Sequence, residues 1–132
     1  MVSWMRLDYR VEEVMTRNPA SVKPDNTVMD AVLIMDKLGI GALPVVDENG
    51  RLIGIFTERD LLRRVVARRR NPEKTLIRDV MTPNPVTVKP DESVAEALRI
   101  MSSLKVRHLP VVNDAGILVG IVSIKDIEFV QP

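Results

Sequence analysis

The sequence predicts a mixed α/β (α+β) protein built from two tandem β-α-β-β-α repeats. Residues 11–61 match residues 77–127 without a gap, at an offset of 66 residues. Each copy contains an apolar pattern with helical spacing, and each contains two short β-rich runs around a turn. We therefore expect an N-terminal segment (1–10), a first repeat (11–70), a polar linker (71–76) and a second repeat (77–132).

The size of the repeat predicts that the two copies pack together. A unit of this length cannot bury the apolar faces of its own helices and strands against solvent without help. Packing about a pseudo-twofold axis would place equivalent loops opposite each other. We expect two related clefts between the repeats, each a candidate for ligand binding.

One helix is predicted after a hydroxyl residue in each repeat. Thr27 and Ser93 are each followed three residues later by a carboxylate, Asp30 or Glu96, which is the pattern of a capping box. Downstream, apolar residues recur at helical spacing in both copies. They are Val28, Ala31, Val32, Met35 and Leu38 in the first repeat and Val94, Ala97, Leu98, Met101 and Leu104 in the second.

A hairpin is predicted after each of these helices. Leu43–Val46 is a short apolar run that ends at the turn-forming residues Asp47–Gly50, and Leu52–Thr57 is a second run of strand-forming residues. The same pattern occurs in the second repeat. A further helix is expected over Glu58–Arg69, with a counterpart that begins at Ile124.

The composition narrows the classes of function. With no cysteine and one histidine, a disulfide, a thiolate nucleophile or a metal site is not expected. The net charge of +1 argues against a global attraction to nucleic acid or membranes. The apolar runs are too short to span a membrane, and the charges Arg6, Asp8 and Arg10 do not suit a signal peptide, so we expect a cytoplasmic protein.

A hydroxyl and a carboxylate stand three residues apart at the end of each hairpin. These are Thr57 and Asp60 in the first repeat, and Ser123 and Asp126 in the second. The simplest interpretation is that the hydroxyl caps the next helix and that the carboxylate lies in its positive first turn. A carboxylate is also an acceptor-only group that suits both hydroxyls of a ribose, and a helix N-terminus attracts phosphate.

These residues resemble the cystathionine-β-synthase (CBS) domain family. The resemblance rests on the ungapped pair, on the Leu-Pro-Val-Val strands, on the Gly-Ile-x-[Thr/Ser]-x-[Arg/Lys]-Asp endings and on the Met-Thr openings, and it covers nearly the whole chain. It implies a disc-like pair of CBS domains, also called a Bateman module. Such a module is a non-catalytic regulator that binds AMP, ADP, ATP or S-adenosylmethionine between its repeats, and we expect AMP first. The resemblance also implies ribose-binding roles for Asp60 and Asp126, and phosphate or ribose contacts for Thr57 and Ser123.

The two repeats differ most just before the Leu-Pro-Val-Val strand. Arg107 and His108 in the second repeat stand where the first repeat has Gly41 and Ala42. In the family, basic residues in this segment reach the phosphates of a nucleotide, so Arg107 and His108 are candidate phosphate ligands. The alternative is a solvated arginine beside a histidine that bonds to backbone. Since glycine and alanine offer no such contact, we expect two unequal sites.

Four further residues are candidates for contacts with the adenine or ribose. Ile40 and Val106 precede the strands, and apolar side chains of this kind hold adenine in the family; the alternative is that they belong to the core. Thr16 and Thr82 mark the segments that open the two repeats and carry the remaining candidate contacts.

Three classes of function compete. An enzyme is not expected, because the single histidine has no recognisable nucleophile or acid–base partner in the sequence. A ligand-free dimerisation or protein-interaction module is the alternative to an energy-sensing nucleotide module, and nucleotide affinity separates them. A homodimer and an effector protein are the expected partners. The arginine cluster Arg63, Arg64 and Arg68–Arg70 could bind nucleic acid, but it also suits the C-terminus of a solvated helix.

Overall fold

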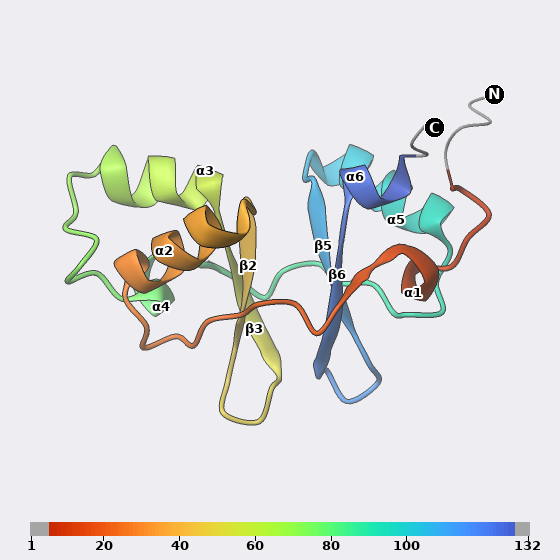
Figure 1. Ribbon diagram of the computed structural model, residues 1–132, viewed down its shortest axis with the longest axis horizontal. Helices are drawn as coiled ribbons and strands as arrows, with labels where there is room; N and C mark the ends of the chain where they lie inside the picture. Colours follow the sequence, from red (N-terminus) through yellow and green to blue (C-terminus); the bar gives the residue numbers. More distant parts are fainter. Residues whose placement is uncertain (1–5, 129–132) are drawn as a thin grey trace. The chain divides into compact units, whose positions relative to one another are not determined.

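The computed structural model describes residues 6–128 and divides into two compact units. Unit 2 consists of Ala20–Pro85, and unit 1 consists of the chain before and after it, up to Pro19 and from Val86 onward. Figure 1 shows the helices and strands of both units. Each unit contains one three-stranded sheet, so the mixed α/β class expected from the sequence is confirmed.

The compact units do not coincide with the sequence repeats. The segment that opens the first repeat, up to Pro19, belongs to the unit that holds the hairpin of the second repeat. Conversely, the segment that opens the second repeat, residues 77–85, belongs to the unit that holds the hairpin of the first. The two copies of the repeat have therefore exchanged their opening segments.

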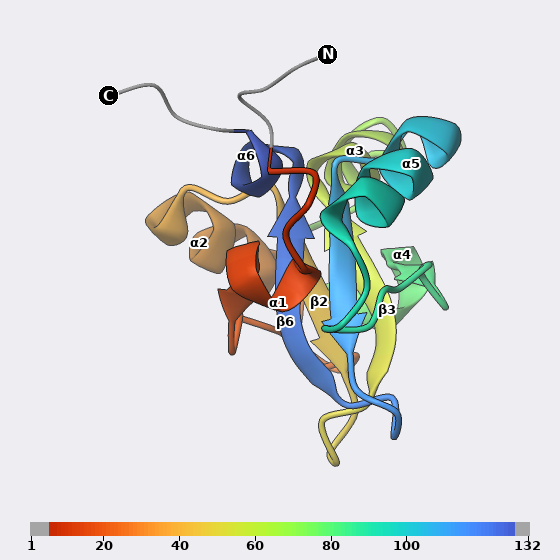
Figure 2. The same cartoon turned by 90° about the vertical axis from the view of Figure 1, so that its right-hand side faces the viewer.

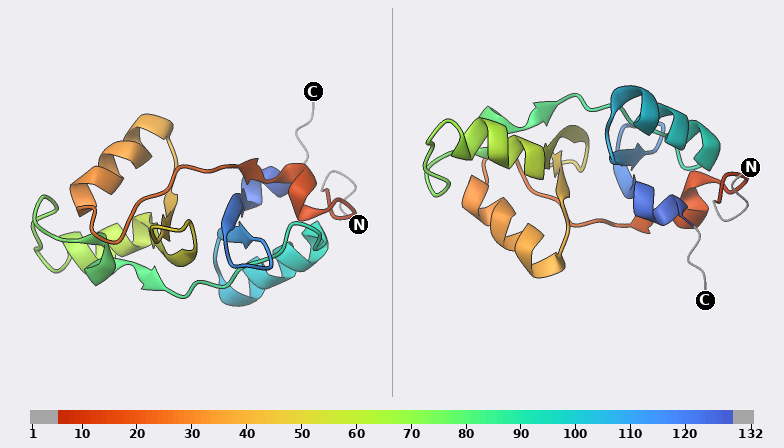
Figure 3. Two further views of the ribbon diagram at one scale, coloured as in Figure 1. Left: turned by 90° about the horizontal axis from the view of Figure 1, so that it is seen from below. Right: turned by 90° about the horizontal axis from the view of Figure 1, so that it is seen from above.

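Unit 2 is built around a sheet with the strand order β2-β3-β4, in which both pairs are antiparallel. Its helices α2 and α3–η1 lie next to each other and pack on the sheet (Figure 3). The register places Ala42 opposite Thr57 and Ile55 opposite Thr82. The elements are α2 (Val28–Leu38), β2 (Ala42–Val46), β3 (Leu52–Thr57), α3 (Glu58–Asp60), the π-helical segment η1 (Leu61–Val66), α4 (Ile77–Val80) and β4 (Thr82–Pro83).

Unit 1 repeats this arrangement with the strand order β1-β6-β5, again antiparallel throughout. Helix α1 lies beside β6 (Figure 2). The register places His108 opposite Ser123 and Thr16 opposite Ile121. The elements are α1 (Val11–Val14), β1 (Thr16–Arg17), α5 (Val94–Leu104), β5 (His108–Val112), β6 (Leu118–Ser123) and α6 (Ile124–Ile127).

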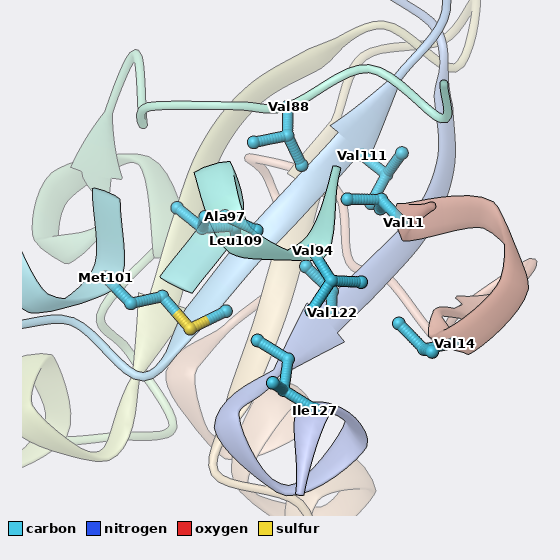
Figure 4. Close-up of a cluster of buried hydrophobic side chains, with 10 residues drawn as sticks. All are labelled: Val11, Val14, Val88, Val94, Ala97, Met101, Leu109, Val111, Val122 and Ile127. Carbon is cyan, nitrogen blue, oxygen red and sulfur yellow. The ribbon is translucent and has the colours of Figure 1, made fainter. Parts of the chain in front are cut away.

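Each unit has a core of its own, made of apolar side chains. In unit 1, Val11 of α1 and Val122 of β6 belong to the same buried cluster as Met101 of α5 (Figure 4). Phe56 of β3, Val65 of η1 and several residues of α2 form the equivalent cluster in unit 2. Since a fully buried side chain of this kind contributes about 1.5–3 kcal/mol, these contacts hold the opening segment on the sheet of the other repeat.

The long helices and both hairpins are confirmed, with three differences in detail. At Thr27 the full capping box forms, but the Glu96 carboxylate bonds to Arg99 Nε rather than closing the box at Ser93. The helix expected over Glu58–Arg69 ends at Val66 and turns from α to π geometry after Asp60. The short helices α1 and α4 were not predicted, because a segment of four residues is too short to show the helical spacing of apolar side chains.

Candidate functional site

The hairpin register gathers the candidate residues of each unit at one end of its sheet. In unit 2, β2 begins where β3 ends, and Glu58 N donates to the carbonyl of Gly41 at 3.0 Å. Strand β4 adds Thr82 on the other side of β3. We call this group of five residues, Gly41, Ala42, Thr57, Asp60 and Thr82, the Asp60 corner.

The same register builds an equivalent group in unit 1. Ile124 N donates to the carbonyl of Arg107 at 3.0 Å, as Glu58 N does to Gly41 in unit 2. We call Thr16, Arg107, His108, Ser123 and Asp126 the Asp126 corner. The exchange of opening segments thus decides which threonine joins which aspartate.

In the Asp60 corner the carboxylate is buried and surrounded by donors. Asp60 is 6% exposed, and its Oδ2 accepts from Thr57 N at 3.0 Å and from Thr57 Oγ1 at 3.2 Å. Its Oδ1 accepts from Thr82 Oγ1 at 3.1 Å and lies 3.6 Å from Arg64 Nε. Arg64 is held in place because its Nη1 also donates to the Met81 carbonyl at 2.7 Å. Both oxygens of Asp60 therefore already have partners.

In the Asp126 corner the carboxylate is only partly buried and has fewer partners. Its Oδ2 accepts from Ser123 N at 2.8 Å and from Ser123 Oγ at 3.1 Å. Thr16 occupies the strand position equivalent to Thr82, but among the described residues no hydrogen bond joins its hydroxyl to Asp126. Within the same residues, both printed contacts of Asp126 involve Oδ2, and none involves Oδ1.

The basic candidates lie at the edge of the Asp126 corner. Arg107 is exposed and directly precedes β5, while His108 is the first residue of that strand and is half-buried opposite Ser123. Their backbone positions match Gly41 and Ala42 of the Asp60 corner. The structure therefore places an exposed arginine before the first strand residue of one corner and a glycine at the equivalent position of the other.

Glu58 fills the space that the bare backbone leaves, and the sequence analysis did not single it out. A Cβ atom built on Gly41 would collide with Glu58 Oε1 and would lie 3.1 Å from Glu58 Cδ. The aligned residue of the other repeat is Ile124. A comparison of positions 58 and 124 would have shown this charge difference from the sequence.

Two other assignments change with the structure. Ile40 and Val106 are 37% and 39% exposed and belong to neither buried cluster, so the alternative that they are core residues is wrong. Each lies next to its corner, one residue before Gly41 or Arg107. Arg64, which the sequence grouped with a solvated basic cluster, instead contacts Asp60.

Two kinds of feature are absent from the described part of the chain. No helix between residues 6 and 128 is long and apolar enough to cross a bilayer. In the same range, no three His, Cys, Asp or Glu side chains gather where they could hold a metal ion.

Solved structures of similar fold include proteins with adenosine-containing ligands. The CBS domain pair of protein MJ0100, in complex with 5′-methylthioadenosine and S-adenosyl-L-methionine, superimposes with a TM-score of 0.83 at 34% identity, over 90% of this chain and 92% of that one. CBSX2 in complex with AMP has a TM-score of 0.80 at 30% identity, with coverage of 90% and 92%.

Sequence comparison identifies the family directly. An uncharacterized protein of Methanopyrus kandleri is 39% identical over 122 residues, which is 92% of this chain and 62% of that protein. This chain thus spans less than two thirds of that relative. The family model of the CBS domain matches residues 11–67 and again residues 77–130. With both repeats matched, the chain belongs to the CBS domain family and contains two copies of the domain.

Proposed function

We propose that this chain is a non-catalytic regulatory module that binds an adenosine-containing ligand at its aspartate corners. The observation that carries the proposal is the same group in both units: an aspartate bonded to the hydroxyl residue three positions before it, at the end of a hairpin. An ionised carboxylate accepts hydrogen bonds only, which suits the two hydroxyls of a ribose. Relatives of the same fold, with 30% and 34% identity, hold AMP, methylthioadenosine or S-adenosylmethionine.

The proposal assigns the Asp126 corner to a nucleotide, with AMP as the first ligand to test. Asp126 Oδ1 is available to the ribose, and Ser123 lies beside it. Arg107 presents a planar fork of donors suited to a phosphate, and His108 adds a second donor or charge. Val106 and Thr16 would complete the contacts with the nucleoside.

Regulation follows if the ligand binds one conformation or assembly state better than another. We propose a cytoplasmic homodimer that passes the signal to an effector protein and reports cellular energy state through its nucleotide. Large apolar side chains on the helices of unit 2 support a subunit contact, because Leu33, Leu62 and Val66 are each about 60% exposed.

The test is isothermal titration of AMP, ATP and S-adenosylmethionine into the wild type, Asp60→Ala and Asp126→Ala. Loss of a hydrogen bond to a charged group lowers affinity by about 10- to 150-fold. We expect Asp126→Ala to weaken AMP binding by this amount. Asp25→Ala removes an exposed carboxylate elsewhere and serves as the matched control. Analytical ultracentrifugation of the same samples, with and without ligand, reports the assembly state.

No binding of any of the three ligands to folded, monodisperse wild-type protein would reject the nucleotide proposal. The chain would then be a ligand-free interaction module, and its partner would have to be sought by other means. Equal loss in Asp25→Ala and Asp126→Ala would reject the assignment of the ribose to Asp126.

A further inference from the structure

The two corners carry opposite charge at the same backbone position. In the Asp126 corner, the residue that accepts a hydrogen bond from the next helix is Arg107, and the donor is the apolar Ile124. In the Asp60 corner, the equivalent acceptor is Gly41, and the donor is Glu58. The carboxylate of Glu58 reaches back over Gly41, into the space that a side chain at position 41 would take. A cation in one unit is therefore replaced by an anion in the other.

Three arginines follow Glu58 on the same helical segment, and two of them, Arg59 and Arg63, line one hollow with it. Arg64 is bound to Asp60 and to the Met81 carbonyl. Arg59 is exposed and corresponds to Lys125 in the Asp126 corner, so this cation is common to both units. Position 41 itself has no side chain, and Glu58 is the ionisable group that covers it.

From this arrangement we propose that Glu58 makes the Asp60 corner selective for adenosine derivatives whose 5′ group is neutral or cationic, and selects against 5′-phosphates. The inference rests on the proposed function, with Asp60 holding the ribose hydroxyls. In this proposal the 5′ group of the ligand extends toward Gly41, where the Glu58 carboxylate lies. A phosphate there would face a carboxylate, whereas a thioether avoids the repulsion and a sulfonium or ammonium is attracted.

The size of the effect follows from the exposure of Glu58. Water screens an exposed charge pair, so the repulsion is worth far less than it would be in a buried site. We expect a preference of about tenfold at low ionic strength, which shrinks as salt is added.

The test uses the full chain with Asp126→Ala, which disables the other corner. Adenosine, 5′-methylthioadenosine, S-adenosylmethionine and AMP are titrated calorimetrically into this protein and into the same protein with Glu58→Gln added. We expect 5′-methylthioadenosine or S-adenosylmethionine to bind about tenfold tighter than AMP. Glu58→Gln keeps the shape and removes the charge, so it should remove most of that preference. Glu73→Gln changes another exposed glutamate and should leave the preference unchanged. Glu58→Ile, which copies the other unit, is an independent second variant.

The outcomes separate this inference from the proposed function. If AMP binds the Asp126→Ala protein as tightly as the 5′-neutral compounds do, or if Glu58→Gln and Glu58→Ile leave the ratio unchanged, the inference is overturned. It is also overturned if the wild type binds a nucleotide but the Asp126→Ala protein binds nothing, and the function then stands at the Asp126 corner alone. A wild type that binds no adenosine compound overturns both.

Discussion

The Asp60 and Asp126 corners have the same motif and the same backbone register, yet they differ in how far the carboxylate is engaged. Asp60 has partners on both oxygens, whereas Asp126 is bonded through Oδ2 alone within the described chain. Under the proposed function, a ribose at Asp126 would bind through Oδ1 without displacing a partner that lies among the described residues. At Asp60 it has to displace Thr82 or share Oδ1 with Arg64. A shared motif therefore does not imply equal readiness to bind.

The difference originates outside the motif. Thr57 and Ser123 bond to their aspartates in the same way, and both opening strands carry a threonine. Arg64, however, corresponds to Val130 in the other repeat, which cannot form an ion pair. The residue four positions after the aspartate thus separates the two corners.

The largest expected effect comes from the two glycines that let the opening strands approach their sheets. A Cβ on Gly54 would lie 2.5 Å from Met81 Sδ and 3.0 Å from the Thr82 carbonyl, and a Cβ on Gly120 meets Met15 and Thr16 at the same distances. We expect Gly54→Ala and Gly120→Ala each to cost about 1–3 kcal/mol in urea unfolding. Gly54→Ala should cost more, because a shift of β4 also pulls Thr82 away from Asp60. The reverse order would mean that the Thr82 bond contributes little.

An intermediate effect is expected at the threonines themselves. Thr82→Val keeps the shape but removes the donor to buried Asp60, which should lower the free energy of unfolding by about 1 kcal/mol. Thr16→Val removes a hydroxyl with no recorded bond to its aspartate, and its effect should stay within about 0.5 kcal/mol. Urea titration of both variants measures the difference. Equal losses would contradict the contrast between Asp60, which has partners on both oxygens, and Asp126, which is bonded through Oδ2 alone among the described residues.

The smallest effect is expected where the α2 and α5 helices begin. The backbone N–H of Thr27 lowers the pKa of Asp30, while the pKa of Glu96 is lowered by Arg99. Asp30→Ala should therefore lower stability slightly more than Glu96→Ala at neutral pH, since the hydrogen bond from Thr27 N to the Asp30 carboxylate is lost. A carboxylate with a lowered pKa stabilises the fold above its unfolded-state pKa and loses this effect as the pH falls through its folded-state value. In acid, the free energy of unfolding of each variant should therefore equal that of the wild type. Urea titrations at several pH values measure it. A difference that persisted in acid would assign the effect to packing.

The sequence predicts the local elements of this fold well, but not the exchange of its opening segments. Helices α2 and α5 and both hairpins follow from periodicity and turn residues within each repeat. The pairing of Thr16 with Ile121 joins residues more than a hundred positions apart, and no local pattern in either segment records it. For the same reason, Thr82 was expected near the candidate sites without an assigned partner.

For the candidate sites, the sequence predicts residue types better than their contacts. Asp60 and Asp126 stand out because they recur at matched positions. The ion pair of Arg64 with Asp60 depends on the helical turn that follows the motif. The approach of Glu58 to Gly41 is possible because glycine has no side chain. Both are visible only when the elements are placed in space.

The exchanged segments also have a consequence for the order in which the protein is made. Unit 2 is one continuous stretch, so all its residues have been synthesised once the ribosome passes Pro85. Unit 1 is interrupted, and its β1 strand must wait for β6, whose residues are added more than a hundred positions later. Closing such a long loop carries an entropic cost that local contacts do not. All of unit 2 is therefore synthesised before β6, whereas unit 1 can be completed only after β6 has emerged.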